Sequence, residues 1–484
     1  MSVALPLITM AAGLFLATIP EPTWMRLLAV TVIGVLLATM RIPLLKRVLL
    51  AVILLELPLQ VDRYFGFDDL ASAQNALSGV NVSVTTIALL LLYVLWAMEA
   101  LGGRATATRW RPALPTLAYI AAVLLSVPFA EDVHRSLFEI VLLGQAVLVC
   151  FYLIHAVRDR RDVMFVMACL MADLVLQGLL AAGAGVLGVE AAVGPVEVQS
   201  LGGRIGGTLG HPNTLGMFLI MLLPAALAGY ATLPTKGQRL LAAAAFGMGM
   251  VALVLTASRG AWTGAILSLA MFSIIGRRRG WLTARTITFM AASSLVVVAL
   301  SLPEVIARLA EYDNGAAQAR LPLMTLANRV IGQSPIVGVG INNFAVAMND
   351  HLTVDLSNAW ISTVHNKYLL VWGETGVIGL AAFLWVLVSA LRTGFGGRHW
   401  RDPMLGSLAV GFACALLAGM IHMSVAIYHA RSHTQMIWLL VGMVAALTNI
   451  NHDADRRDRR RSSAARPAEH DAFANNRPMD GAAQ

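Results

Sequence analysis

Charged side chains are scarce in this chain of 484 residues. Only 13% of the residues are Asp, Glu, Lys or Arg, and 58% are hydrophobic, whereas an average soluble domain is about 25% charged. So few polar side chains cannot cover the surface of a soluble fold. Apolar runs longer than about 18 residues also recur along the chain, and runs of that length are typical of membrane-spanning helices. A soluble enzyme and a disordered protein are therefore excluded.

Cysteine is rare too. The three cysteines (Cys150, Cys169 and Cys414) lie in apolar runs and form no CxxC pair, so we interpret them as small buried residues and not as a disulfide framework.

Motifs for common ligands are missing from the sequence as well. There is no GxxxxGK[ST] loop for a nucleotide. Since there is also no folded basic domain with interleaved aromatic residues, we expect no nucleic-acid partner. The nearest approach to a metal motif is the single pair 68–69, AspAsp, and the sequence predicts no metal site and no cofactor.

The apolar runs predict fourteen membrane spans, or twelve if the short and closely spaced first runs are counted more strictly. The predicted spans are 3–20, 25–40, 46–59, 81–100, 114–130, 135–157, 162–188, 212–231, 239–257, 260–276, 285–303, 366–391, 404–424 and 434–450. The fold class is therefore all-α, a polytopic integral membrane bundle of 12–14 transmembrane helices. One long periplasmic loop, 304–365, is expected to carry short helices that lie along the membrane surface.

We expect three regions along the chain. Residues 1–200 hold the N-terminal transmembrane helices, residues 201–450 form a membrane domain that includes the long loop, and residues 451–484 are rich in Arg and poor in apolar residues. This last region is predicted to be a disordered basic tail in the cytoplasm.

Lys and Arg set the orientation, because cytoplasmic loops carry an excess of both. Alternating spans with both termini in the cytoplasm place most of the 35 Lys and Arg residues on that side. This bias predicts a multi-pass protein of a bacterial inner membrane whose other face meets the periplasm. The cations left on the periplasmic face are Arg26, Arg63, Arg135, Arg204, Arg259, Arg308, Arg320, Arg329, Lys367 and Arg431.

Two of these periplasmic arginines sit in unusual places. Arg259 lies in a turn, 256–262, that is too short to leave the membrane surface, and Arg204 lies in a glycine-rich segment, 202–213, just before a span. An arginine so close to hydrocarbon needs a partner. Either its guanidinium reaches out to lipid phosphates, or it is a bidentate fork for a phosphate or diphosphate ligand.

The segment 202–213 has the composition of an anion-binding turn. Its glycines let backbone N–H groups approach an anion, Pro212 suits the first turn of the next helix, and His211 stands near the helix cap. The N-terminus of a helix that begins there would favour an anion. A flexible loop has the same composition, so the segment alone does not decide between the two interpretations.

A third group of polar residues stands where the long loop meets a span. His365 and Asn366 lie at the predicted entrance to that span, and Glu374 lies deeper in it. A histidine can accept a proton at neutral pH, so His365 is a candidate general base, with a structural histidine as the alternative. Glu374 suits an orienting role or a polar contact between helices. The other acids inside predicted spans are either functional, for example as proton relays, or structural. Their scatter without a repeat favours the structural interpretation for these three: Glu56, Glu139 and Asp173.

Four pieces of the chain together resemble the superfamily of O-antigen ligases and O-antigen polymerases, which are bacterial polytopic membrane glycosyltransferases. The pieces are RIGGTLGHPN (204–213), SRGAW (258–262), PIVGVGINNF (335–344) and HNKYLLVWGETGVIG (365–379). Their order and the long loop before the histidine match as well. The resemblance covers roughly residues 200–390, and the first spans carry no recognisable motif.

The resemblance implies an enzyme that transfers a glycan from undecaprenyl diphosphate to an acceptor hydroxyl at the periplasmic face. The acceptor is lipid A-core in a ligase of lipopolysaccharide biosynthesis, or a growing glycan in a polymerase of surface polysaccharide or exopolysaccharide. Carried over by motif, His365 is the base, Arg204 and Arg259 hold the diphosphate, and Arg329 is a looser match for the same role. The supporting residues are His211, Asn213, Asn366 and Glu374. Membrane lipids are the other expected partner.

Elementary chemistry agrees with this implication. Expulsion of a diphosphate from the anomeric carbon develops negative charge that cations must stabilise, and arginines can take the place of a metal ion, so we expect metal-independent transfer. Two alternatives stay open. One is a membrane transporter of a lipid-linked sugar or a small anion, with polar groups near the midplane, and the other is an assembly partner without catalysis. The sequence does not separate a ligase from a polymerase.

Overall fold

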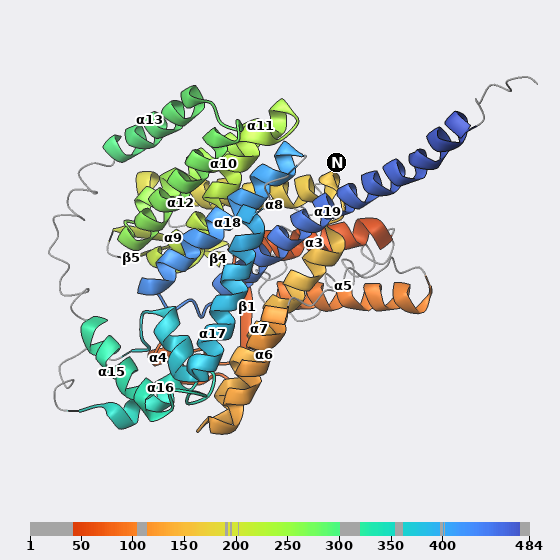
Figure 1. The fold of residues 1–484 in the computed structure, drawn as a ribbon. Helices are drawn as coiled ribbons and strands as arrows, with labels where there is room; N and C mark the ends of the chain where they lie inside the picture. The colour runs from red at the N-terminus through yellow and green to blue at the C-terminus, as the bar shows by residue number, and fades with distance from the viewer. Residues whose placement is uncertain are drawn as a thin grey trace, which may run out of the picture.

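A computed structural model describes residues 42–103, 114–188, 192–193, 196–201, 203–300, 320–353, 362–396, 400 and 402–474. The predicted spans 3–20 and 25–40 lie outside these residues, as does the first part of the predicted loop, 304–319. In the described part of the chain helices dominate, as Figure 1 shows. This confirms the predicted all-α class.

Nine helical stretches in the described residues are long and apolar enough to cross a membrane. They are α5 (Val84–Leu101), α7 (Val133–Ala156), α8 (Arg160–Leu187), α9 (Pro212–Ile220) continued by α10 (Leu223–Thr232), α11 (Lys236–Leu255), α12 (Arg259–Arg278), α17 (Lys367–Gly396), α18 (Pro403–His422) and the first part of α19 (Arg431–Ala474). Three shorter apolar helices coincide with further predicted spans: α3 (Ile42–Glu56), α6 (Leu114–Ser126) and α13 (Ala284–Leu300). The chain is a polytopic membrane protein.

Small residues bring these helices close together. A Cβ at Gly178 of α8 would lie 2.5 Å from Cβ of Met248 in α11, and a Cβ at Gly411 of α18 would lie 2.7 Å from Cβ of Ala228 in α10. Glycine at such contacts lets two backbones approach, which is how many membrane helices pack. The pairs α8–α11 and α10–α18, together with α7–α19, form much of the buried core.

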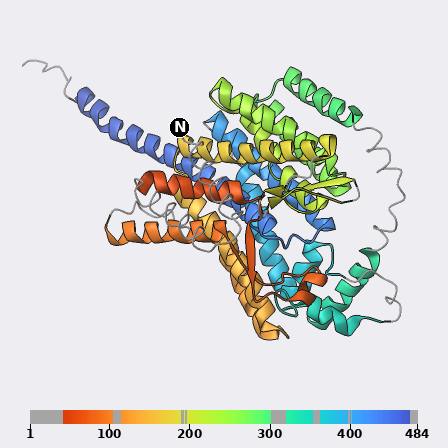
Figure 2. The same cartoon turned by 180° about the vertical axis from the view of Figure 1, so that it is seen from behind.

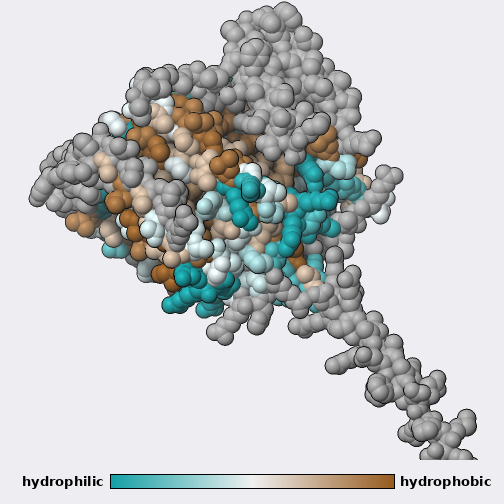
Figure 3. Space-filling view, turned by 90° about the horizontal axis from the view of Figure 1, so that it is seen from above, coloured by the Kyte–Doolittle hydropathy of each residue, from teal (hydrophilic) through white to brown (hydrophobic). Residues whose placement is uncertain are grey.

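The outer surface is apolar where helices face outward. In the space-filling view of Figure 3, hydrophobic residues form a broad area and hydrophilic residues gather beside it. Helix α5 is an example, with Leu90, Val94 and Met98 all more than half exposed. Exposed apolar residues along a helix are expected where lipid replaces water as the solvent.

Three small antiparallel hairpins, which the sequence did not predict, lie between the helices. They pair β1 (Asp62–Phe65) with β2 (Val80–Ser83), β3 (Ala192–Val193) with β4 (Val196–Glu197), and β5 (Gln199–Leu201) with β6 (Arg204–Gly207). The β1–β2 hairpin encloses the short helix α4 (Asp69–Ala73). The strands are too short to show the alternating pattern that identifies a strand in a sequence.

The long loop does carry short helices, as predicted. They are α15 (Arg320–Gln333), α16 (Phe344–Ala347) and the 3₁₀ turn η2 (Met348–His351). Figures 1 and 2, taken from opposite sides, both show α15 and α16 at the same end of the molecule as α4. This end also carries the starts of α7, α9, α12 and α17, and we call it the His365 end. It is the end that the charge bias predicts to be periplasmic.

Two asparagines fasten the loop to this end of the bundle. The side-chain amide of Asn342 donates to the carbonyl oxygens of Leu77 and Arg135, at 2.9 Å each. The side chain of Asn343 accepts from the backbone N–H of Asp132 at 2.8 Å and donates to its carbonyl oxygen at 3.0 Å. The INN piece of the third motif therefore positions the loop rather than a ligand.

Helix α17 is broken near its start, and the loop fills the break. Gly376 has φ 65° and ψ −175°, a conformation that is open almost only to glycine. Val339 N–H donates to the carbonyl oxygen of Gly373 at 2.9 Å, and Val377 N–H donates to that of Pro335 at 2.9 Å. The third and fourth motifs are thus packed against each other, and the loop satisfies backbone groups that the break would leave without a partner.

A buried ion pair joins the first described span to the last. The guanidinium of Arg431 contacts both carboxylate oxygens of Glu56, at 2.7 and 2.9 Å, and its Nε lies 2.8 Å from Oδ1 of Asp62. Arg431 and Glu56 are each 1% exposed. This bidentate geometry compensates two charges that would be very costly alone in the membrane.

The C-terminal region differs from the prediction in one respect. Helix α19 continues to Ala474, into the residues from 451 onward for which the sequence predicted no regular structure. Asp and Arg recur along this stretch, so the pattern used to predict disorder also permits a solvated helix that carries charges of both signs.

Candidate functional site

The segment that carries His365 is held firmly against the β1–β2 hairpin. Backbone N–H of Thr363 donates to the carbonyl oxygen of Gln74 at 3.0 Å, and the side chain of Asn75 donates to Ser362 Oγ at 2.9 Å. On the other side of His365, Asn366 Oδ1 accepts from two backbone N–H groups in the first turn of α17. Asn366 is therefore a helix cap, and His365 sits between two fixed points.

The protonation state of His365 follows from one contact. Its Nδ1 lies 3.1 Å from the carbonyl oxygen of Thr363. A carbonyl oxygen can only accept, so the proton of the neutral ring is on Nδ1 and the lone pair is on Nε2. Burial, and after it the charge of Arg320, lower the pKa of His365 from 6.5 to about 4. At neutral pH the ring is therefore a neutral base whose accepting atom is Nε2.

Arg204, His211 and Asn213 form one hydrogen-bonded group. Arg204 donates through Nη2 to Asn213 Oδ1 at 2.8 Å and through Nε to the carbonyl oxygen of Thr256 at 3.0 Å. His211 caps α9, because its Nδ1 accepts from the backbone N–H of Asn213 at 3.1 Å. The proton of the neutral His211 ring is therefore on Nε2, which makes that atom a donor. Burial and then Arg204 lower the pKa of His211, so the neutral ring is favoured.

Arg259 begins α12, three positions after the carbonyl group that binds Arg204. Its neighbour Gly260 faces His422 of α18, and a Cβ there would lie 3.2 Å from Nε2 of that histidine. A Cβ at Gly216 of α9 would lie 2.8 Å from Cβ of Ala261. The starts of α9 and α12 are thus packed together: α12 begins at the predicted diphosphate-binding residue Arg259, and α9 begins beside the predicted supporting residues His211 and Asn213.

The structure relates His365 to this group through electrostatics. A proton on His211 would lower the pKa of His365, and the charge of Arg204 lowers the pKa of His211. Such effects act over a few ångströms within a protein. Arg204, His211 and His365 are therefore near enough to influence one another electrostatically.

Arg329 has different surroundings. It lies on α15, and its Nη1 donates to the carbonyl oxygen of His351 at 3.1 Å and to the hydroxyl of Thr353. These contacts join two parts of the long loop. They give Arg329 a structural task within the loop.

Glu374 belongs to a buried polar group that the sequence did not reveal as a unit. It lines a cavity of about 10 Å³ together with Glu139, Lys367 and His429, which is room for about one water molecule. Nζ of Lys367 lies 3.9 Å from Oε1 of Glu139. Glu139, an acid inside a predicted span, is therefore paired with a lysine two positions after His365.

A cluster of histidines was also missed. His422 ends α18, His429 lies between α18 and α19, and His433 is in the first turn of α19. Tyr428 lies between two of them, with ring centroids 5.9 Å from His422 and 5.4 Å from His433. Burial, and then Lys367, lower the pKa of His429 to about 3. Three histidines between positions 422 and 433, next to a periplasmic arginine, were the available signal in the sequence.

Several polar atoms of this cluster have no hydrogen-bond partner among the described residues. They are Nδ1 of His422, Nδ1 of His433 and the hydroxyl of Tyr428. Buried polar atoms are nearly always paired in proteins. Three exceptions in one place, beside Gly260 and the start of α9, are typical of a site that a polar ligand or water completes.

Residues 242–384 match the family model described as O-Antigen ligase. The matched segment contains Arg259, Arg329, His365, Asn366 and Glu374, whereas Arg204, His211 and Asn213 precede it. A search of curated proteins finds no match. The family match confirms that the chain resembles the O-antigen ligase and polymerase superfamily. It supports, in general terms, an enzyme that joins glycans and uses a lipid-linked glycan and an acceptor as substrates.

Proposed function

We propose that this protein transfers a glycan from undecaprenyl diphosphate to an acceptor hydroxyl at the periplasmic face of the bacterial inner membrane. The observation that carries the proposal is the neutral His365 ring, with its lone pair on Nε2, at the same end as the hydrogen-bonded group of Arg204 and His211. A base for the acceptor and cations for a diphosphate are the two requirements of this reaction.

In the proposed step the acceptor oxygen attacks the anomeric carbon of the donor sugar. A bond forms between these two atoms, and the bond from the anomeric carbon to the phosphate oxygen breaks. The hydroxyl proton passes to Nε2 of His365, while undecaprenyl diphosphate leaves with the bonding electron pair. Arg204, Arg259 and the Nε2–H group of His211 stabilise the negative charge that develops on the leaving group.

The buried polar groups near His365 suit supporting tasks in this scheme. Lys367 and Glu139 are paired beside the segment that carries the base, which fixes the start of α17. The unsatisfied atoms of His422, Tyr428 and His433 are suited to hydroxyl groups of the sugar. No step needs a metal ion, because arginines supply the positive charge.

Transfer by the purified protein in liposomes tests the proposal. The donor is a glycan on undecaprenyl diphosphate, and the expected products are an extended acceptor and free undecaprenyl diphosphate in equal amounts. Movement of intact donor across the bilayer without new glycosidic bonds would instead support a transporter.

Deletion of the gene separates a ligase from a polymerase. Loss of a ligase leaves completed chains on the lipid carrier, whereas loss of a polymerase leaves single repeats on lipid A. Unchanged surface polysaccharide would contradict both assignments.

A further inference from the structure

Asp173 is a fully buried acid near the middle of α8. Its side chain is 0% exposed, and neither carboxyl oxygen has a hydrogen-bond partner among the described residues. Helix α8 is long and apolar enough to cross a membrane. An ionised carboxyl group in such surroundings is very costly unless a cation or several donors compensate its charge.

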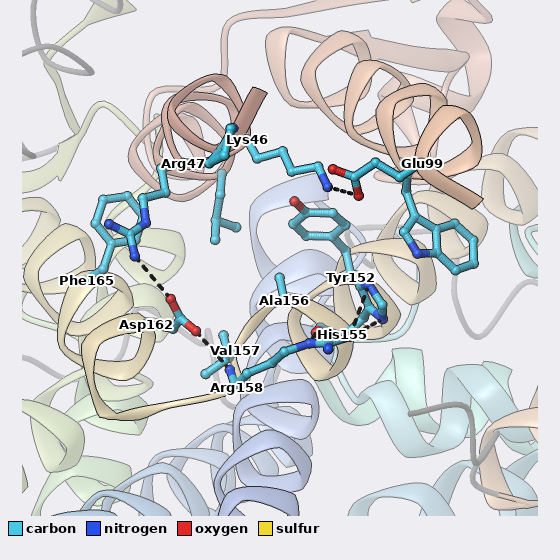
Figure 4. A pocket seen from close by; sticks show the side chains of 13 residues that line it. Lys46, Arg47, Glu99, Tyr152, His155, Ala156, Val157, Arg158, Asp162 and Phe165 are labelled. Atoms are coloured by element: carbon cyan, nitrogen blue, oxygen red, sulfur yellow. Dashed lines mark hydrogen bonds and ion pairs between the residues drawn. The ribbon is translucent and has the colours of Figure 1, made fainter. Parts of the chain in front are cut away.

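The other acid of α8 shows the partners that a carboxylate has in this protein. Oδ1 of Asp162, in the first turn of the helix, lies 3.5 Å from Nη2 of Arg47. Oδ2 of Asp162 accepts from the backbone N–H of Arg158 at 3.0 Å. Figure 4 shows both contacts, beside a cavity of about 220 Å³ that Asp162 helps to line. Asp173 has no contact of either kind with the described residues.

In the described part of the chain, the elements that pack most extensively against α8 offer Asp173 no cation. They are α11, α3 and β6. The charge that acts on Asp173 comes from α3 and is that of another acid, Glu56. Strand β6 contributes Arg204, which belongs to the hydrogen-bonded group described above. Helix α11 has no titratable residue between Arg239 and its end, and the neighbour on α8 is the thiol of Cys169, one turn earlier.

A second unpaired atom lies one turn further along α8, in the buried side chain of Gln177. Its Nε2 donates to Oγ1 of Thr208 at 2.7 Å, and this hydroxyl donates to the carbonyl oxygen of Pro58 at 2.6 Å. A carbonyl oxygen can only accept, so the single hydroxyl proton of Thr208 is directed at Pro58. Thr208 must therefore accept from Gln177, which turns Oε1 of the amide away from Thr208.

Oε1 of Gln177 lacks a donor among the described residues. Side chains four positions apart on a helix are neighbours, and those of Gln and Asp can form a hydrogen bond. A carboxylate at position 173 would present only further acceptors to Oε1. A carboxylic acid presents an O–H donor, directly or through one buried water. A single proton on Asp173 thus removes the charge and completes the amide.

The glycine-rich segment 202–213 closes on this amide. A Cβ at Gly207 would lie 3.0 Å from Oε1 of Gln177, and Gly207 has φ 59°, a value that favours glycine. Gly207 and Thr208 lie between Arg204 and His211 in the sequence. The amide of Gln177 therefore contacts the segment at its centre, between two groups that the proposed reaction uses.

We propose that Asp173 is protonated at neutral pH and that its O–H group donates to Oε1 of Gln177. A chain of hydrogen bonds then runs from Asp173 through Gln177 to Thr208. Asp173 is a positioning residue in this chain, because Thr208 belongs to the segment that presents Arg204 and His211 to the diphosphate. The positioning role rests on the proposed function, whereas the protonation state does not.

Infrared spectroscopy of the purified full chain in a neutral detergent tests the protonation state. The carbonyl stretch of a protonated carboxyl group absorbs where a carboxylate does not. The spectrum of the wild type minus that of Asp173→Asn at pH 7 should therefore contain the band of one protonated carboxyl group. Asp162→Asn is the matched control on the same helix, and its difference spectrum should contain carboxylate bands. Carboxylate bands in the Asp173→Asn difference spectrum would overturn the proposal.

Thermal unfolding in the same detergent tests the hydrogen bond to Gln177. Asp173→Asn keeps a neutral side chain with an N–H donor and should unfold at the wild-type temperature. Asp173→Val removes the donor and leaves Oε1 of Gln177 unsatisfied, which should lower the unfolding temperature. Equal unfolding temperatures for the two variants would overturn the assigned bond. If Asp173→Val does not fold, the infrared comparison and Gln177→Leu decide.

Transfer kinetics test the positioning role. Asp173→Val and Gln177→Leu should each raise KM for the lipid-linked donor about tenfold and keep kcat, because the loss is one hydrogen bond and His365 is untouched. The double variant should match either single variant, since both break the same chain. Asp173→Asn should keep the wild-type KM. An unchanged KM in Asp173→Val and Gln177→Leu would overturn the positioning role, whereas absence of transfer by the wild type would contradict the proposed function and leave the infrared and unfolding results valid.

Discussion

Gly376 of α17 lies directly against the carbonyl oxygen of Ile336, so that a Cβ at position 376 would overlap this oxygen. Ile336 belongs to the third motif, and Gly376 belongs to the fourth, which begins at His365. Their contact lets the loop 335–340 replace part of the backbone pairing of α17. The position of His365 at the start of α17 therefore depends on a glycine eleven positions further along the chain.

Gly376→Ala should destabilise the protein and impair transfer. The added Cβ both clashes with Ile336 and disfavours the φ of 65°, and each effect typically costs about 1–3 kcal/mol. Thermal unfolding in detergent measures the loss. Gly396→Ala, at the end of the same helix and with open space around its Cβ, is the control and should unfold like the wild type. Equal stability of the two variants would contradict the proposed dependence.

His365→Gln should abolish most transfer if His365 is the base. Glutamine can accept a hydrogen bond but cannot take a proton, and loss of general base catalysis typically costs about 10²- to 10⁴-fold in rate. The measurement is the initial rate of transfer in liposomes. His134→Ala, at an exposed histidine at the same end, should keep the wild-type rate. Substantial transfer by the Gln variant would leave His365 with a positioning role only.

The rate should depend on pH through the same residue. Burial, with the charge of Arg320, lowers the pKa of His365 to about 4, so the ring stays neutral and able to accept a proton from pH 8 down to about pH 5. Below that range protonation removes the base, and the rate should fall as the pH drops through 4. Recovery of activity on return to pH 7 excludes unfolding as the cause. An acid limb centred near 6.5 would show that the ring is not buried as described.

Arg259→Lys should lose most activity, because an ammonium group cannot reproduce two parallel N–H contacts to a diphosphate. Removal of one such contact made in the transition state typically costs about 2–4 kcal/mol. The rate constant at saturating donor measures this loss. Arg277→Lys, at the other end of the same helix, controls for charge-conserving changes in α12. A near-normal rate for Arg259→Lys would favour an arginine that only binds lipid phosphates.

Transfer should persist in a chelator. The candidate metal ligand Asp68 already has partners, since Oδ2 lies 2.7 Å from Nη2 of Arg135 and Oδ1 accepts from the N–H of Ala71. Although burial raises the pKa of Asp68, these contacts outweigh it and the pKa is lowered. Activity that is lost with a chelator and restored by Mg²⁺ or Mn²⁺ would contradict a metal-independent reaction and return attention to Asp68 and Asp69.

Hydropathy predicted the helices well because each span is a long apolar run, and the match requires no knowledge of long-range contacts. The same reasoning named Arg204, Arg259 and His365, because a polar residue beside hydrocarbon is visible in the sequence. Hydropathy could not show that Lys367 pairs with Glu139. Nor could it show that Nε2 of His433 lies 3.2 Å from the carbonyl oxygen of Thr214 in α9. Such pairs are distant in sequence and follow no period, so only the folded chain brings them together.

The Asn342 and Asn343 side chains illustrate the same limit. The sequence showed them only as part of a motif, and their task became clear from hydrogen bonds to Leu77 and Asp132. The break at Gly376 was also hidden, because hydropathy is unchanged across it. A glycine within an otherwise helical pattern was the available signal.

The buried pair of Glu56 and Arg431 has a consequence for how the protein is made. The two residues are 375 positions apart, and at about 5–20 residues per second a ribosome needs roughly 20–75 s to make the chain between them. For that time α3 holds an acid without its arginine, in a solvent that penalises a lone charge. The early spans therefore cannot reach their final packing until α19 enters the membrane, so insertion of the last helix completes the assembly of the first.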